Sequence, residues 1–334
     1  MWRPLLLLSA PIVAASAQSY HVAKTSTLGG DGGWDYIALD TVGHRLFVAR
    51  QNRVMVIDPE SGKVLAEIPG LNRAHGVAFS YATGKGFATS GGDSSVIVFD
   101  LKSLQVLGRT TAAVDADAII FDPATKHIFT FNGDANSSSV IDAASGQRIG
   151  NIPLGGGPEF GVSSGDGKVY VNLEDSSMVE EIDAVAMKVT RRWSLAPCQS
   201  PSGLAIDRAH HLLFSGCHNQ VMAISDATTG KVVAAVPIGQ GIDACRFDPG
   251  TQLAFASNGD GTLTVIREDS PTKFTVVGNV ATKRGARTME IDEKTHRVFT
   301  VTADFGPPPA PTADRPRPRP TILPGTFALL ELDP

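Results

Sequence analysis

The stretch Asp243-Ala244-Cys245-Arg246-Phe247-Asp248, followed by Leu-Ala-Phe-Ala-Ser-Asn-Gly-Asp-Gly-Thr-Leu-Thr-Val-Ile over 253–266, predicts three short strands separated by two turns. The strand residues are mostly apolar, β-branched or aromatic, and Gly, Pro, Asn and Asp separate them. Asn258-Gly259-Asp260 is a strong signal for a tight turn between two strands. The same order of strand and turn signals recurs along the chain, so this stretch is one copy of a repeat.

An aromatic residue marks the second strand of every copy, and successive aromatics are 40 to 44 residues apart. These aromatics are Phe47, Phe87, Phe129, Tyr170, Phe214, Phe255 and Phe299. Seven residues earlier an Asp or Ser ends an apolar run: Asp40, Ser80, Asp122, Ser163, Asp207, Asp248 and Asp292. Four short strands at this period are typical of a propeller blade. The sequence therefore predicts an all-β fold over residues 18–334, a seven-bladed β-propeller of four-stranded antiparallel blades.

The last copy has only three predicted strands, Arg287–Ile291, Arg297–Thr302 and Phe327–Leu332. Near the other end, Tyr20–Leu28 is strand-like but belongs to no blade of its own. We therefore expect this N-terminal strand to complete the last blade and close the ring. The alternative is a loose N-terminal arm.

Residues 1–17 have the features of a secretory signal peptide: Arg3, the apolar run Leu5–Ala15, and the cleavage motif Ala15-Ser16-Ala17. The apolar run is too short to span a bilayer, which takes about 20 residues. We therefore expect a periplasmic or secreted protein without a membrane span. A net charge of -5, with no clustered basic face, argues against a nucleic-acid partner. We also expect a monomer.

The chain has three cysteines, and export permits disulfides. Cys198 comes just before the first strand of the fifth blade, and Cys217 ends the second strand of that blade. In an antiparallel sheet these two points share one face, so we favour a Cys198–Cys217 disulfide over three free thiols. Cys245, within an inner strand, is expected to be a small buried apolar residue.

Several second strands share a pattern: Leu46–Ala49, Ile128–Asn132, Val169–Asn172 and Ala254–Asn258. They resemble the Tyr-Val-Thr-Asn repeat of the YVTN β-propeller family, in particular its exported, YncE-like bacterial branch. The resemblance covers nearly the whole chain after the signal peptide and implies the propeller fold, but it does not indicate a chemistry. Three blades depart from the pattern, with Ser90, Gly216 and Thr302 at the Asn position. In a WD40 blade the third strand ends in Trp-Asp, but no third strand of this chain does so. The only Trp-Asp in the sequence, Trp34-Asp35, is at the start of a first strand.

Alignment of the seven copies brings out a candidate binding site near the start of the first strands. The equivalent positions hold Asp35, His75, Asp117, Pro158, Ser202, Asp243 and Arg287. Around a closed ring, acids and bases alternate over the five charged members, which we call the channel-mouth cluster: Asp35, His75, Asp117, Asp243 and Arg287. Two alternatives are an ion-pair network that only joins the blades, and side chains that point into solvent, where such pairs contribute about 0–1 kcal/mol.

The interleaved order suggests how these groups affect one another. A carboxyl beside Arg287 should have a lowered pKa, and a histidine between two acids should have a raised pKa. A cation between the acids argues against a divalent metal, so no metal or other cofactor is expected.

No catalytic motif stands out. Gly161–Gly165 matches Gly-x-Ser-x-Gly, but it falls in a predicted hairpin where no helix follows, whereas the nucleophile elbow needs a strand-to-helix turn. His210-His211 has no third ligand at metal-site spacing and fits a hairpin tip.

One large insertion interrupts the last blade, the proline-rich segment 304–325. Prolines favour extended polyproline II segments, and a loop of this length is uncommon unless it is functional or disordered. We expect it to cover part of the channel mouth as a gate or a partner-docking arm, with Arg315, Arg317 and Arg319 adding positive charge.

The function that fits best is an exported binding or scaffold module, with a small polar molecule or an exported protein at the channel mouth. Two other functions stay open. One is a propeller enzyme, a hydrolase, lactonase or lyase, that uses the charged cluster. The other is an accessory or electron-transfer partner that resembles quinoprotein subunits.

Overall fold

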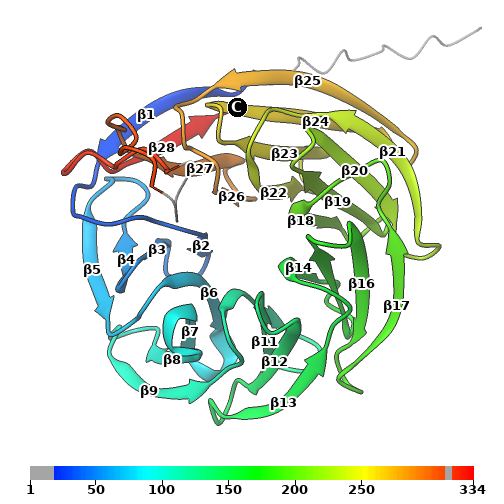
Figure 1. Cartoon of the computed structure of the whole chain (residues 1–334), viewed down its shortest axis with the longest axis horizontal. Coiled ribbons are helices and arrows are strands. Elements are labelled where there is room, and N and C mark those ends of the chain that lie inside the picture. Colours follow the sequence, from blue (N-terminus) through cyan, green and yellow to red (C-terminus); the bar gives the residue numbers. More distant parts are fainter. Residues whose placement is uncertain (1–18, 313–317) are drawn as a thin grey trace, which may run out of the picture.

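The computed structural model describes residues 19–312 and 318–334, so the predicted signal peptide and two of the loop arginines, Arg315 and Arg317, lie outside the described residues. Seven four-stranded antiparallel sheets are arranged around a central channel (Figure 1). The predicted seven-bladed propeller is confirmed. No helix in the described part of the chain is long and apolar enough to cross a membrane.

The first four blades follow one another without a crossover, each running from an inner to an outer strand. Blade one contains β2 (Ile37–Asp40), β3 (Arg45–Arg50), β4 (Arg53–Ile57) and β5 (Val64–Pro69). Blade two contains β6 (Ala74–Ser80), β7 (Lys85–Ser90), β8 (Ser95–Asp100) and β9 (Val106–Thr111), with 3-10 turns η1 (Tyr81–Thr83) and η2 (Gly91–Asp93). Blade three contains β10 (Ala116–Asp122), β11 (His127–Asn132), β12 (Ser137–Asp142) and β13 (Arg148–Pro153). Blade four contains β14 (Pro158–Ser163), β15 (Lys168–Leu173), β16 (Met178–Asp183) and β17 (Lys188–Ser194).

The last three blades complete the ring. Blade five contains β18 (Pro201–Asp207), β19 (Leu212–Cys217), β20 (Val221–Asp226) and β21 (Lys231–Pro237). Blade six contains β22 (Ile242–Asp248), β23 (Leu253–Asn258), β24 (Thr262–Ser270) and β25 (Lys273–Ala281). Blade seven contains β26 (Met289–Asp292), β27 (Arg297–Thr302), β28 (Ala328–Asp333) and, as its outer strand, β1 (His21–Thr27).

The repeated residues explain why the blades form and stack. Each inner strand ends at the repeated Asp or Ser, and all seven second-strand aromatics are buried. Because a single sheet cannot cover both of its faces, these aromatics pack into the spaces between neighbouring blades. Phe47, for example, stacks on Phe99 of the next blade at 5.9 Å between ring centroids.

Ring closure follows the prediction. The strand β1 pairs antiparallel with β28, from His21 opposite Asp333 to Thr27 opposite Ala328. Tyr20, just before β1, is only 5% exposed; its ring contacts Phe255 edge-on at 5.0 Å, and its hydroxyl donates to the carbonyl of His296. The N-terminal segment is therefore an integral strand of blade seven.

The structure also contains the favoured disulfide. Cys198 and Cys217 are bonded, with their Cα atoms 5.6 Å apart, and Cys245 is a buried free thiol. The disulfide ties the segment before β18 to the end of β19, on the face where the inner strands begin.

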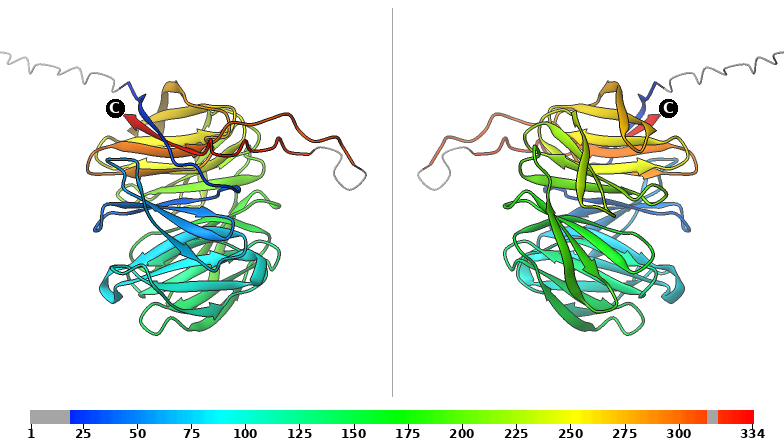
Figure 2. Two further views of the ribbon diagram at one scale, coloured as in Figure 1. Left: turned by 90° about the vertical axis from the view of Figure 1, so that its left-hand side faces the viewer. Right: turned by 90° about the vertical axis from the view of Figure 1, so that its right-hand side faces the viewer.

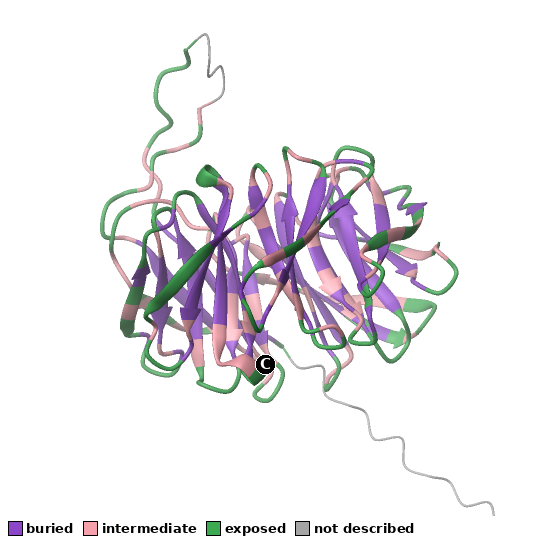
Figure 3. Cartoon of the chain, turned by 90° about the horizontal axis from the view of Figure 1, so that it is seen from below, coloured by how far each residue is buried: buried purple, intermediate pink, exposed green. Residues whose placement is uncertain are grey.

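The proline-rich arm, residues 304–325, leaves this same face between β27 and β28 (Figures 2 and 3). Its base is a short two-stranded ribbon, in which Phe305 pairs with Ile322 and Gly306 N–H donates to the carbonyl of Thr321. Beyond that base the arm projects away from the ring. The expectation that the loop covers part of the channel mouth therefore holds only for its base, where Phe305, Arg319 and Ile322 line a cavity beside the mouth.

Candidate functional site

The channel-mouth cluster is built by residues at or just before the start of five inner strands. Asp35 precedes β2, His75 and Asp117 lie in β6 and β10, Asp243 lies in β22, and Arg287 precedes β26. Their equivalent places in neighbouring blades bring the five side chains to one level of the ring, as the alignment of the repeats predicts.

His75 joins two of the acids. Its Nδ1 lies 2.6 Å from Oδ2 of Asp35 and 3.2 Å from Oδ1 of Asp117. The predicted order of a histidine between two carboxylates is therefore present. A single Nδ1–H makes its short hydrogen bond to Asp35, which leaves Asp117 Oδ1 as the more weakly held of the two oxygens.

Arg287 has one partner in the cluster. Its Nη1 donates to Oδ1 of Asp243 at 3.1 Å. Asp35 acts on Arg287 only through its charge, since no ion pair forms between them in the described part of the chain. Of the two carboxylates expected on either side of Arg287, Asp243 is therefore hydrogen-bonded to it and Asp35 acts on it by charge.

Repeat alignment missed Glu159, which follows the uncharged Pro158 on β14. Burial, and then the charge of Asp117, raises the pKa of Glu159 to about 9. The alignment compared one position per blade, and Glu159 is one residue away from that position. A search for any acid within two residues of the aligned site would have found it.

Burial controls the acid–base properties of the cluster. Burial raises the pKa of Asp117 to about 7 against the opposing charge of His75, and it raises the pKa of Asp243 to about 6 against that of Arg287. The expectation that the acid beside Arg287 has a lowered pKa is therefore wrong for Asp243: the charge of Arg287 does lower its pKa, but the loss of hydration outweighs that effect. For His75, burial alone would lower the pKa, but the hydrogen bond to Asp35 and the charges of Asp117 and Asp35 outweigh burial and raise it, as expected.

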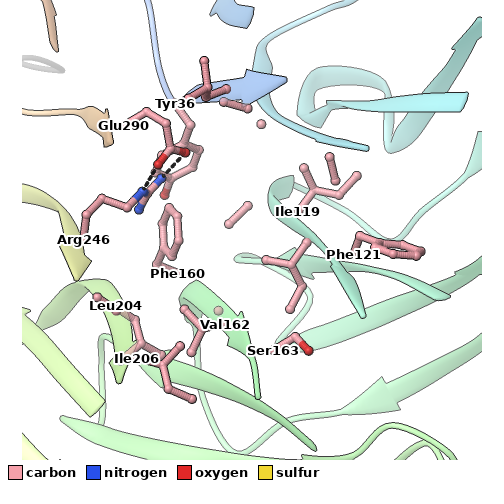
Figure 4. A pocket seen from close by; sticks show the side chains of 18 of the residues that line it. Tyr36, Ile119, Phe121, Phe160, Val162, Ser163, Leu204, Ile206, Arg246 and Glu290 are labelled. Atoms are coloured by element: carbon pink, nitrogen blue, oxygen red, sulfur yellow. Dashed lines mark hydrogen bonds and ion pairs between the residues drawn. The ribbon is translucent and has the colours of Figure 1, made fainter. Parts of the chain in front are cut away.

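Two aromatic rings lie below the cluster. Tyr36 and Phe160 meet edge-on at 5.1 Å between centroids (Figure 4). Arg246 lies over the Phe160 ring at 4.9 Å and forms two hydrogen bonds with Glu290, at 2.7 and 3.1 Å. A channel cavity of about 320 Å³ reaches these residues. The aromatic pair and the Arg246–Glu290 pair therefore line the same part of the channel.

A larger cavity of about 550 Å³, the side cavity, opens beside the cluster where blades six, seven and one meet. Arg287 belongs to both the cluster and this cavity. The base of the proline-rich arm supplies one wall through Phe305, Arg319 and Ile322. Three arginines, two aromatic rings and a histidine contribute to the lining: Arg284, Arg287, Arg319, Trp34, Phe305 and His218.

Buried polar atoms around the mouth that lack a hydrogen-bond partner within the described residues include Trp34 Nε1, His75 Nε2 and Asp243 Oδ2, and Asp117 Oδ1 has only its 3.2 Å contact with His75 Nδ1. Buried polar groups in folded proteins are nearly always hydrogen-bonded, because an unpaired one costs about 1–3 kcal/mol. Unpaired atoms gathered at one mouth therefore indicate a place where a ligand or ordered water completes the hydrogen bonding.

Arg50, also missed by the sequence analysis, organises the glycine-rich segment 28–33 beside the mouth. It is fully buried at the end of β3, and its guanidinium donates to the carbonyls of Gly30, Asp31, Gly32 and Gly33 at 2.9–3.3 Å. It also lies 3.7 Å from the centroid of the Phe327 ring. Arg50 therefore positions the segment that leads directly into Trp34 and Asp35.

Among the described residues, two groups of side chains have ligand atoms close enough to hold one cation. One is Asp35, His75 and Asp117 at the mouth, and the other is Asp207, His210 and Glu268. At the mouth, Asp35 and Arg287 interact through their opposite charges. The guanidinium of Arg287 is therefore a positive charge that already lies near these carboxylates.

Neither a family model nor a curated protein sequence matches the chain. Solved structures match its fold over almost the full length. A structure of U3-55K has a TM-score of 0.76 at 10% identity, over 93% of this chain and 99% of that chain. A chain in a crystal structure of the mitotic checkpoint complex has a TM-score of 0.76 at 13% identity, over 100% of this chain and 98% of its own. A structure of the RRP9 WD40 repeats has a TM-score of 0.74 at 12% identity, over 95% of this chain and 98% of that chain. At these identities the similarity shows that the chain has the β-propeller fold.

Proposed function

We propose that the chain is an exported binding module of the YVTN-like kind that holds a small anionic molecule in the side cavity at the channel mouth. The observation that carries the proposal is the convergence of Arg284, Arg287 and Arg319 on one cavity of about 550 Å³. This volume lies within the range of small-molecule sites, about 300–1,000 Å³. Export is inferred from the signal-like residues 1–17.

The lining favours an anion because its positive groups outnumber its acids. Asp260 is the one carboxylate that lines the cavity among the described residues, and it already accepts hydrogen bonds from Gln240 N–H and from Thr262. Arginine guanidinium groups bind carboxylates and phosphates through paired hydrogen bonds. The ligand class is therefore a carboxylate or a phosphate.

The aromatic walls favour a ligand that also has an apolar part. Trp34 and Phe305 lie 6.1 Å apart between ring centroids, and Arg284 lies over the Phe305 ring at 6.0 Å. The unpaired Trp34 Nε1 can donate one hydrogen bond to the ligand. An exported protein that inserts an acidic side chain next to an apolar one would use the same groups.

The test is a binding panel on the purified protein, in which each aromatic carboxylate or aryl phosphate is paired with its neutral amide or alcohol. We expect the anions to raise the melting temperature and to change Trp fluorescence. Arg319→Gln and Arg284→Gln should each weaken binding by about tenfold or more, because hydrogen bonds to charged groups contribute about 1.5–3 kcal/mol.

Arg267→Gln is the matched control, since it removes the same charge from β24, where Arg267 pairs with Asp269 and does not line the cavity. Equal binding of neutral and anionic members, or unchanged affinity in both cavity variants, would rule out the proposed ligand class.

A second function, catalysis at the mouth, is favoured by one observation. Asp117, with a pKa of about 7, lies beside His75, and groups with such shifted pKa values are typical of acid–base catalysts. A hydrolase, lactonase or lyase would use this pair. The test is a panel of lactones and esters. Turnover by the unaltered chain that is lost in Asp117→Asn would support catalysis, whereas binding without turnover would support only the binding function.

A further inference from the structure

A second cluster, which we call the blade-junction cluster, lies on the face of the ring opposite the channel mouth. Its members are Asp207, His210 and Glu268. Asp207 ends the inner strand β18 of blade five, and His210 follows in the hairpin to β19. Glu268 comes from β24 of the neighbouring blade six.

An extension of blade six brings Glu268 to this place. The strand β24 has nine residues, whereas the third strands of the other blades have five or six. The added residues pair with β25 from Arg267 opposite Thr275 to Ser270 opposite Lys273. Glu268 therefore extends beyond the usual length of a third strand, toward the His210 hairpin.

The three side chains meet at one atom. His210 Nδ1 lies 2.7 Å from Oδ2 of Asp207 and 2.7 Å from Oε1 of Glu268. One N–H cannot make a full hydrogen bond to both oxygens. Asp207 has a second interaction, since its Oδ1 accepts from Ala209 N–H. Glu268 has no such interaction outside the cluster: apart from its contacts with His210 and Asp207, neither of its oxygens has a partner in the part of the chain that the structure describes.

Both carboxylates are withdrawn from solvent. The side chains of Asp207 and Glu268 are each 1% exposed, while that of His210 is 40% exposed. His210 is the one basic side chain paired with either acid within the described residues. Burying an uncompensated carboxylate is costly unless it is paired or binds a cation.

We propose that the blade-junction cluster is a binding site for a divalent transition-metal ion of the Zn²⁺ type, with Asp207 Oδ2, His210 Nδ1 and Glu268 Oε1 as ligands. Zn²⁺ binds His nitrogen and carboxylate oxygen at about 2.0–2.2 Å in a tetrahedral arrangement, which puts neighbouring ligand atoms about 3.3–3.6 Å apart. The 2.7 Å separations are hydrogen-bond distances, so each pair of ligand atoms would move apart by about 0.6–0.9 Å when the ion replaces the shared proton. Two carboxylates and a neutral imidazole balance a charge of +2.

The ligand set and its exposure indicate which ion fits. Imidazole suits Zn²⁺ and related transition metals, whereas Mg²⁺ and Ca²⁺ prefer oxygen ligands alone. The exposed edge of His210 leaves room for water to complete the coordination shell. Because Glu268 belongs to blade six and the other two ligands to blade five, the ion would hold these two blades together.

The test uses the full chain stripped of metal with a chelator and then titrated with ZnSO₄ by calorimetry, and with CoCl₂ by visible absorption. We expect one tightly bound ion and a higher melting temperature with Zn²⁺ than with Mg²⁺. Removing a residue that only hydrogen-bonds to a metal ligand weakens metal binding by about 10- to 100-fold. Glu268→Gln and His210→Asn each alter a ligand itself, so each should weaken Zn²⁺ binding by at least this factor. His210→Asn is at an exposed position and so serves as the variant that keeps the core intact.

Two controls separate this site from others. His211→Asn changes the adjacent exposed histidine, whose φ of 56° asparagine tolerates, and should leave Zn²⁺ binding unchanged. Asp117→Asn removes a ligand of the channel-mouth group and should also leave it unchanged. The proposal fails if the stripped protein takes up no zinc, if Glu268→Gln and His210→Asn bind like the unaltered chain, or if Asp117→Asn alone abolishes binding.

Discussion

Tyr20 provides a direct test of how the ring is held closed. Its side chain is 5% exposed, its ring packs on Phe255 of blade six, and its hydroxyl hydrogen-bonds to the carbonyl of His296 in blade seven. Replacing a buried aromatic by alanine typically costs about 3–5 kcal/mol. We expect Tyr20→Ala to lower the free energy of unfolding by this amount. Tyr20→Phe, which removes only the hydrogen bond, should cost about 1 kcal/mol.

The measurement is equilibrium unfolding in guanidinium chloride, followed by far-UV circular dichroism and Trp fluorescence. Thr25→Val is the matched control, because Thr25 is exposed on the same strand and valine retains its β-branched shape. Surface substitutions of this kind usually change stability by no more than about 0.5 kcal/mol. A Tyr20→Ala midpoint equal to that of Thr25→Val would show that β1 is a dispensable arm and would refute its role in closure.

Three more predictions concern other parts of the chain. Cys198→Ser with Cys217→Ser should lower the unfolding free energy by about 3 kcal/mol, because the bond closes a loop with a sequence separation of 19; an unchanged denaturation midpoint would contradict this. Arg50→Met should cost about 1.5–3 kcal/mol, since it removes the charged hydrogen bonds that hold the carbonyls of the glycine-rich segment, and Arg50→Lys should recover only part of the loss in the same unfolding assay. Stability of the unaltered chain should fall as pH rises from about 4 to 7, because Asp117, with a pKa raised from 3.8 to about 7, keeps a proton when folded that it loses on unfolding. Asp117→Asn should make this slope shallower, and identical slopes in the two proteins would count against the shift.

The fold could be predicted because its signal is repeated and local. Each blade places a buried aromatic in its second strand and an Asp or Ser at the end of its first, so seven weak signals support one another. Closure was also predictable, because a blade with only three strands has an unpaired edge and the N-terminal strand needs a partner. Pairing the two completes the hydrogen bonding of both. These inferences needed only the period of the repeat and the alternation of apolar residues.

The site was less predictable because it depends on contacts between residues far apart in the sequence. Alignment of the copies placed Asp35, His75 and Asp117 together, but burial, which no repeat pattern measures, set the direction of the Asp243 pKa. Glu268 is 58 residues from His210 and reaches it only through an extended strand. This cluster thus combines a residue that follows the repeat, Asp207, with one that breaks it, Glu268, and only the first could be placed by aligning the copies.

The pairing of β1 with β28 also determines how the ring would respond to mechanical force. In their antiparallel register, His21 lies opposite Asp333, so the start of one strand and the end of the other are at the same edge of blade seven. A pull applied to these two points loads the backbone hydrogen bonds one after another, as in a zipper, and not all at once in shear. The ring should therefore open first at this seam under tension. A ligand in the side cavity, which contacts the base of the arm between β27 and β28, would raise the force needed to separate the rest of blade seven.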